Sequence, residues 1–331
     1  MELPFELNVP VKGYQHHAYL LGVLYAVDPQ AMIWVHNYFV QLQYNIHNKN
    51  CSFNFYKGEV EFPRLYFDSE CISKATLLDF HIPITEFIKY KIENGYYVRF
   101  DLDGYYLPNQ RTYQKEHFWH DILIYGYADG IFQTAGYDAQ MRYGAAVISE
   151  DVIKAAFYSK LFSERSIPGK NITLFRRGIS GRKLEIDTML IYDQLFDYIY
   201  SGNTAERYGF YDPTGGKKIF GLSACEQLKN LLGGYSLDVR PFHILWEHKV
   251  CMQARIQFLS DSGLISDKKK EIKLYQKLVH DAFLIRNKVL KVMVKYDVES
   301  VEHIQNMLDK LIYEEKCLLV GLLEEMRKAD G

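Results

Sequence analysis

Apolar residues alternate with polar ones in much of the first half of the chain and follow helical spacing in the second half. The clearest feature lies at 117–138, where two apolar runs flank Ala128-Asp129-Gly130. Asp-Gly between β-branched and aromatic runs favours a tight hairpin, because both residues tolerate positive φ. We therefore predict a β-hairpin here, with His120 near the start of its first strand and Asp138 just after its second.

The same pattern predicts further strands and helices around this hairpin. Short strands are expected at 51–56, 63–67, 96–102, 145–148 and 172–175. A first helix is expected between Tyr14 and Asp28-Pro29. Further helices are expected at 31–45, 84–93, 150–159, 186–200, 221–232, 240–259, 268–295 and 300–328. A strand-rich first part and a helical last part predict an α+β chain.

Composition narrows the classes of partner. The chain has 331 residues and a formal net charge of −2, so no dominant basic field favours nucleic acid. It contains 27 tyrosines and 20 phenylalanines, which suit sheets and pockets for flat or apolar ligands. We expect no membrane partner, because no run of apolar residues is long enough to span a bilayer and the first residues lack a signal-peptide pattern.

The five cysteines are scattered and form no CxxC pair, which is typical of reduced thiols in a cytoplasmic protein. They are Cys51, Cys71, Cys225, Cys251 and Cys317. We expect all five to be structural or incidental, and we expect no cofactor and no resident metal.

Candidate chemistry gathers at the predicted hairpin. A hairpin brings its strand ends together, so His120 and Asp138 should be neighbours, and a histidine held by a carboxylate is the base half of a catalytic triad. The alternative is two solvated polar residues. Asp101 and Asp103 alternate on one strand and so face one side, where they could serve acid–base chemistry or simply a turn.

A second candidate region is the start of the first helix, Tyr14-Gln15-His16-His17. Backbone N–H groups at a helix start favour anions. Adjacent histidines on a helix point about 100° apart, so a two-histidine metal grip is not expected there.

Several segments together resemble the papain-like family of bacteriocin-processing peptidases, and in particular the N-terminal domain of the butirosin-biosynthesis acyltransferase and related proteins of nonribosomal-peptide clusters. These segments are Tyr14 to Leu24, Gly95-Tyr96-Tyr97-Val98, Tyr105-Tyr106-Leu107-Pro108, His120 to Asp138, Asp238 to Phe242 and Trp246 to Lys249. The resemblance implies a papain-like α+β domain at 1–200 with an antiparallel sheet. A mostly helical region at 201–331 would pack on it.

The resemblance also implies acyl or peptidyl transfer from a carrier-bound thioester, with a carrier protein or synthetase as partner and a small-molecule or peptidyl substrate. His120 would be the base, oriented by Asp138, and the helix start at Gln15, His16 and His17 would face it across one cleft. Substrate contacts are expected from Tyr14, Asp101, Asp103, Tyr105 and His117.

The family nucleophile, a cysteine at the start of the first helix, is absent, since no cysteine precedes Cys51. Two alternatives to the transferase therefore stay open. One is a non-catalytic papain-like binding module for a carrier protein, peptide or metabolite. The other is a metal-dependent hydrolase that uses His117, His120 and Asp138.

Overall fold

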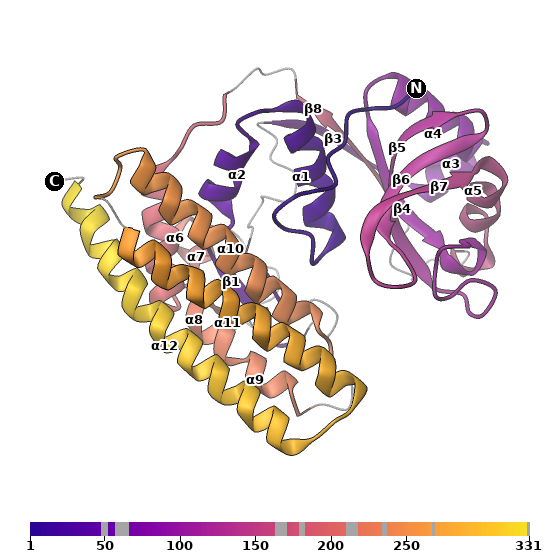
Figure 1. Cartoon of the computed structure of the whole chain (residues 1–331). Coiled ribbons are helices and arrows are strands. Elements are labelled where there is room, and N and C mark those ends of the chain that lie inside the picture. The colour runs from indigo at the N-terminus through magenta and orange to yellow at the C-terminus, as the bar shows by residue number, and fades with distance from the viewer. Residues whose placement is uncertain are drawn as a thin grey trace. The chain divides into compact units, whose positions relative to one another are not determined.

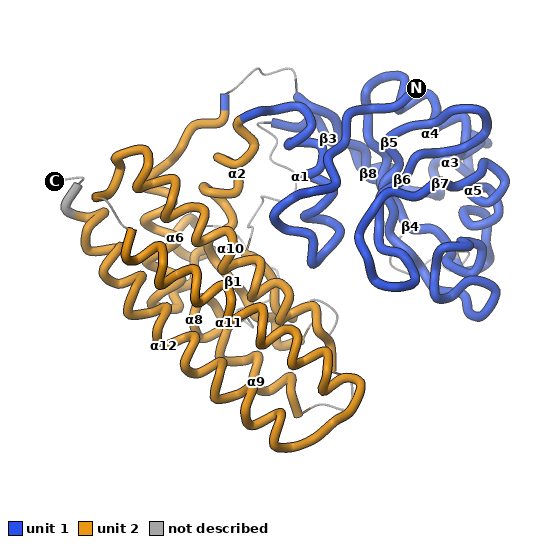
Figure 2. Tube along the Cα trace, in the orientation of Figure 1, with its two compact units in different colours: residues 1–29, 61–183 blue, residues 30–60, 184–331 orange. Residues whose placement is uncertain are grey.

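The computed structural model describes residues 1–47, 52–56, 66–162, 171–178, 183–209, 218–233, 237–266 and 269–329. The chain forms two compact units, one of residues 1–29 and 61–183 and the other of residues 30–60 and 184–331 (Figure 2). We expected a single boundary near residue 200. Residues 30–60 instead belong with the C-terminal part, because their strands and helix pair and pack with elements after residue 184.

The first unit is organised around an antiparallel sheet of six strands, in the order β3-β8-β4-β5-β6-β7. This confirms the antiparallel sheet expected between residues 96 and 148. The strands are β3 Phe67–Ser73, β4 Tyr97–Asp103, β5 Trp119–Ala128, β6 Ile131–Tyr137, β7 Tyr143–Ser149 and β8 Asn171–Arg177. The strand expected at 63–67 lies almost entirely outside the described residues.

The predicted hairpin is confirmed as β5 and β6. Its turn residues Asp129 and Gly130 have φ angles of 51° and 75°, the left-handed pair that a tight two-residue turn requires. The ladder begins with Leu123 opposite Ala135 and shifts register between Ile124 and Gly126. Such a shift bends the strand locally.

Helices cover this sheet. They are α1 Gln15–Val27, α3 Lys74–Asp79, α4 Ile84–Glu93 and α5 Glu150–Phe157, with short 3₁₀ turns at Gly104–Tyr106 and Lys160–Phe162. Helices α1, α4 and α5 begin where the sequence predicts, whereas α3 was not predicted. Ser149 caps α5 by accepting a hydrogen bond from Val152 N, as its position before two acidic residues predicts. Helices α4 and α5 pack against β4, and α1 packs against β6 and β8.

The second unit contains a small antiparallel sheet, β2-β1-β9, and most of the helices. Its strands are β1 Leu42–Asn45, β2 Phe53–Phe55 and β9 Lys218–Phe220. Its helices are α2 Ala31–Tyr38, α6 Thr188–Tyr200, α7 Thr204–Arg207, α8 Gly221–Glu226, α9 Leu228–Leu231, α10 Arg240–Asp261, α11 Lys269–Val294 and α12 Val298–Ala329. The last three run alongside one another as a helical bundle (Figure 1).

Two expected helices of this unit differ from the structure. The helix expected at 31–45 ends at Tyr38, because Leu42–Asn45 pair with strands on both sides. The helix expected at 221–232 is divided into α8 and α9. Among the described helices, none is long and apolar enough to cross a membrane.

A buried polar network joins the helices of the second unit. Lys249 Nζ on α10 lies 2.7 Å from Glu315 Oε2 on α12, with side chains 1% and 0% exposed. The hydroxyls of Tyr198 and Tyr275 both donate to the same carboxylate. Each polar atom of this pair is therefore held by a partner, as a low-dielectric interior requires.

Candidate functional site

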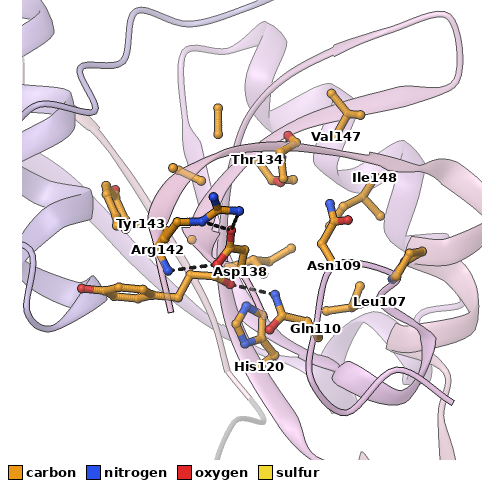
Figure 3. Close-up of a pocket in the computed structure, with 18 residues that line it drawn as sticks. Leu107, Asn109, Gln110, His120, Thr134, Asp138, Arg142, Tyr143, Val147 and Ile148 are labelled. Atoms are coloured by element: carbon orange, nitrogen blue, oxygen red, sulfur yellow. Dashed lines mark hydrogen bonds and ion pairs between the residues drawn. The ribbon is translucent and has the colours of Figure 1, made fainter. Parts of the chain in front are cut away.

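A cavity of about 520 Å³ lies on the sheet of the first unit, where β5, β6 and β7 meet the segment after the first 3₁₀ turn (Figure 3). Its lining residues are Leu107, Pro108, Asn109, Gln110, His120, Ile122, Thr134 to Asp138 and Arg142 to Ile148. The floor is formed by small side chains at paired positions, with Thr134 opposite Ala146 and Gly136 opposite Gly144. A β-carbon added at Gly144 would meet no atom within 4 Å, so the space above it is open.

Two backbone-directed hydrogen bonds hold the wall of this cavity in place. Gln110 Nε2 donates to Tyr137 O at 2.8 Å, and Ala139 N donates to Asn109 O at 2.8 Å. The wall segment Leu107–Gln110 is thereby attached to the end of β6 and to the turn that follows it. The cavity is therefore framed by hydrogen-bonded backbone on two sides.

His120 is the one imidazole among the described residues that line this cavity. Burial lowers the pKa of His120 to about 4, because the charged imidazolium is penalised away from water. Among the described residues, none forms a hydrogen bond with the ring. At neutral pH His120 therefore presents a neutral imidazole, with one donor and one acceptor nitrogen, to whatever occupies the cavity.

Asp138 lines the same cavity, but its carboxylate is bound to the turn that follows β6. It accepts from Arg142 Nε at 2.9 Å and from the backbone N–H groups of Gln140 and Arg142, each at 2.9 Å. Hydrogen bonds from the Arg142 backbone, with its guanidinium, hold the pKa of Asp138 below its usual range. Two of the dashed contacts in Figure 3 join Asp138 to Arg142, and the expected bond between Asp138 and His120 is not formed.

A histidine–carboxylate pair is formed instead by two residues predicted to contact substrate. His117 Nδ1 lies 2.6 Å from Asp103 Oδ2, with side chains 51% and 0% exposed. Ser159 Oγ and Tyr105 N donate to the same carboxylate. The ring of Tyr105 stacks on His117 at 4.4 Å between centroids. The structure thus brings together Asp103, Tyr105 and His117, which the sequence singled out separately.

The start of α1 lies beside the end of β6, where a β-carbon at Gly136 would lie 3.2 Å from Gln15 Nε2. Gln15 Nε2 and Tyr19 Oη donate to Asp121 O at 2.8 and 3.1 Å, beyond the end of the β5–β6 ladder. His16 stacks on Tyr14 at 5.6 Å between centroids, and His17 is buried. None of these α1 residues lines the cavity that holds His120.

Strand geometry explains this separation. Arg99 lies 5.8 Å from the ring centroid of Tyr19, a residue of α1, and it also binds the Asp121 carboxylate. The Asp121 side chain therefore points to the α1 side of the sheet. Successive residues of a strand point to opposite faces. His120 and Asp121 therefore point to opposite faces of β5. None of Gln15, His16 and His17 lines the cavity beside His120, although Gln15 approaches the cavity residue Gly136.

Asp101 belongs to the α1 side of the sheet as well, since it lies opposite Asp121 in the β4–β5 ladder. Burial and the nearby Asp121 carboxylate raise the pKa of Asp101 to about 6, although Arg99 opposes the shift. Asp101 and Asp103 alternate on β4, but only Asp103 turns toward His117. The two carboxylates therefore serve different sites.

The described cysteines lie away from the cavity. Cys71 and Cys317 are exposed, whereas burial raises the thiol pKa of Cys225 to about 11 and that of Cys251 to about 12. Cys51 lies outside the described residues. None of the other four lines the cavity or contacts His117.

The metal alternative depended on His117, His120 and Asp138 acting together. His117 binds Asp103 and Asp138 binds Arg142. Within the described part of the chain, no group of three or more His, Cys, Asp and Glu side chains is arranged to hold a metal ion. The geometry therefore gives this hypothesis no ligand set.

Sequence reasoning missed the cavity itself and Ser159. The available signal was the small residues Gly144 and Ala146, which alternate on β7 and leave space above the sheet at Gly144. Ser159 carried no signal, because it lies 56 residues from Asp103 in the chain. Neither a known protein-family model nor a curated protein sequence matches this chain.

Proposed function

We propose that the first unit is a binding module whose ligand, a small molecule or a peptidyl group, occupies the cavity beside His120. The observation that carries this proposal is a lone neutral imidazole facing about 520 Å³ of space above a floor of small residues. Pockets of this size with few convergent polar groups are the usual form of ligand sites. The ligand would present an apolar body and one polar atom to His120.

Binding fits this cavity better than base catalysis by His120. A general base works best when its pKa lies near the working pH, and burial holds the pKa of His120 at about 4. The α1 start, which would supply oxyanion-stabilising N–H groups, does not line the cavity. His120 is thus better suited to hydrogen bonding than to proton abstraction.

The test is ligand-observed NMR with a set of neutral aromatic fragments on the full chain and on Gly144→Leu. A side chain at Gly144 would enter open space, so this variant should fold normally and lose fragment binding. Gly233→Leu, whose β-carbon also meets nothing within 4 Å, is the matched control in the second unit. Equal binding by all three proteins would contradict the proposal, as would the absence of any fragment binding.

A second candidate function is acyl or peptidyl transfer from a carrier-bound thioester, the activity that the resemblance to the papain-like family implies. It is favoured by the His117–Asp103 contact, because a buried carboxylate that binds Nδ1 leaves Nε2 as the basic nitrogen. An amine would attack the thioester carbon and lose a proton to His117 Nε2. The C–S bond would then break, and the departing thiolate would take that proton.

The experiment for this candidate is aminolysis of an acyl-N-acetylcysteamine thioester by hydroxylamine. His117→Gln should lower the rate by about a hundredfold, the usual contribution of a positioned base. His120→Gln is the control and should change the rate little. Equal rates for the wild-type chain and His117→Gln would remove this candidate.

A further inference from the structure

The outer edge of β7 borders the His120 cavity along its length. β7 is the last strand of the six-stranded sheet, and no described strand pairs with its outer side. Each residue from Tyr143 to Ile148 lines the cavity. The sheet edge and the cavity are therefore one continuous surface.

The hydrogen bonds around β7 determine which of its backbone groups face outward. Glu150 N donates to Gly130 O and Asp138 N donates to Arg142 O, so the pairs at both ends of the strand are hydrogen-bonded ones. Hydrogen-bonded and non-hydrogen-bonded pairs alternate in an antiparallel ladder. Tyr143, Ala145, Val147 and Ser149 are then the non-hydrogen-bonded members, and their N–H and C=O groups point away from β6.

The residues of this edge strand include none of the types that usually protect an exposed strand. Its sequence, Tyr143-Gly-Ala-Ala-Val-Ile-Ser149, contains no charged residue and no proline. Proteins usually place lysine, proline or a covering element at such an edge, because unpaired strands associate with other chains. Ala145 is exposed and Val147 is 56% exposed, so the outward groups are not covered by their own side chains.

We infer that an extended peptide segment of a partner pairs with the edge of β7 and places an apolar side chain in the His120 cavity. This inference rests on the proposed binding function and names its ligand class. Strand addition uses main-chain hydrogen bonds for affinity and side-chain pockets for specificity. The outward backbone groups of Ala145 and Val147 would supply the main-chain hydrogen bonds, and the cavity beside His120 would supply the side-chain pocket.

A peptide suits this surface better than a second copy of the chain. Two copies pairing through β7 would present Gly144 and Ala146 to each other's cavity, and these side chains are too small to fill about 520 Å³. A peptide with large apolar residues at every second position occupies the edge and the cavity together. Pairing between copies is a separate outcome of the test.

The test begins with selection of linear random decapeptides displayed on phage against the immobilised full chain. The dissociation constant of an enriched synthetic peptide is then measured by fluorescence anisotropy for Ala145→Pro and Ala145→Val. Proline at position 145 removes one outward N–H group but keeps every hydrogen bond between β6 and β7, whereas valine also keeps the outward N–H. We expect proline to weaken binding by about tenfold or more relative to valine, as for loss of a main-chain hydrogen bond at an interface.

A scan of N-methylated peptides keeps the test decisive if Ala145→Pro fails to fold. Methylation at every second residue should weaken binding to the wild-type chain, and methylation at the intervening residues should not. Equal affinity of the two Ala145 variants, or a scan without this alternation, would overturn the inference.

The remaining outcomes separate this inference from the proposed function. Fragment binding without any enriched peptide overturns the peptide inference and leaves the binding proposal standing. Loss of both overturns both. A dimer in sedimentation velocity that Ala145→Pro dissociates would assign the edge to a second copy and reject the peptide.

Discussion

Replacing Glu315 with glutamine tests how strongly the second unit depends on its buried ion pair. The glutamine keeps the side-chain shape, and its single oxygen can replace only one of the two carboxylate oxygens to which Tyr198 and Tyr275 donate. It also leaves the Lys249 ammonium without the carboxylate 2.7 Å away. Removing one partner of a buried pair costs about 3–5 kcal/mol. We expect the free energy of unfolding of the second unit to fall by that amount in Glu315→Gln.

The neighbouring residue provides the control. Glu314 binds Lys277 at 2.8 Å, but the two side chains are 33% and 47% exposed. Surface pairs contribute below about 1 kcal/mol, so Glu314→Gln should have a small effect. In Lys249→Met/Glu315→Gln no buried charge is left unpaired, and most of the loss should be recovered. The double-mutant cycle then gives the coupling energy of the pair.

Tryptophan fluorescence during urea unfolding can report the second unit alone. That unit contains Trp34 and Trp246, and the first unit contains Trp119. All variants are therefore compared in a Trp119→Phe background. A loss for Glu315→Gln as small as that for Glu314→Gln would refute the reasoning, and so would a double variant no more stable than Glu315→Gln.

Three further predictions concern the first unit, followed by Trp119 fluorescence in a Trp34→Phe/Trp246→Phe background. The folded-state pKa of His120, about 4, lies below its ordinary value of 6.5, so His120 contributes stability above pH 6.5 that is lost as the pH falls toward 4. His120→Gln should therefore reduce the loss of unfolding free energy between pH 6.5 and 4, and an unchanged loss would contradict this prediction. The folded-state pKa of Asp101, about 6, lies above its ordinary value of 3.8, so the stability that Asp101 contributes is present at low pH and lost as the pH rises through 6. Asp101→Asn should therefore stabilise the unit at pH 8 but not at pH 3, and equal effects at the two pH values would count against this prediction. A β-carbon at Gly22 would lie 2.5 Å from the Phe5 ring, so Gly22→Ala should lower the free energy of unfolding by about 1–3 kcal/mol, whereas Gly144→Ala should leave thermal unfolding nearly unchanged. Similar losses of stability for both variants would show that these contacts do not determine the loss.

The parts of the fold that sequence could predict were those set by local chemistry. The turn at Asp129-Gly130 and the cap at Ser149 depend on residues within a few positions of each other. The helix expected at 31–45 failed because pairing of Leu42–Asn45 with β9 involves residues more than 170 positions away. Helical spacing in one segment carries no information about such a partner.

Strand register decides which face of the sheet His120 occupies. Asp121, and not His120, leaves β5 on the side of α1, and a shift of one residue moves a side chain to the opposite face. The hydrophobic pattern of β5 gives no warning, since Ile122, Leu123 and Ile124 are all buried and both faces are covered. Periodicity could therefore identify the strand but not assign His120 to a face.

This geometry gives two histidines, three residues apart, different chemistry. His117 precedes β5, so its ring is free to turn toward the buried Asp103 carboxylate, and its other nitrogen lies on a half-exposed side chain. His120 lies within β5, and burial keeps its ring neutral beside the cavity. A protein that only binds would depend on His120, and one that transfers an acyl group would depend on His117. Paired substitutions at the two positions, read by fragment binding and by thioester aminolysis, therefore distinguish the two functions.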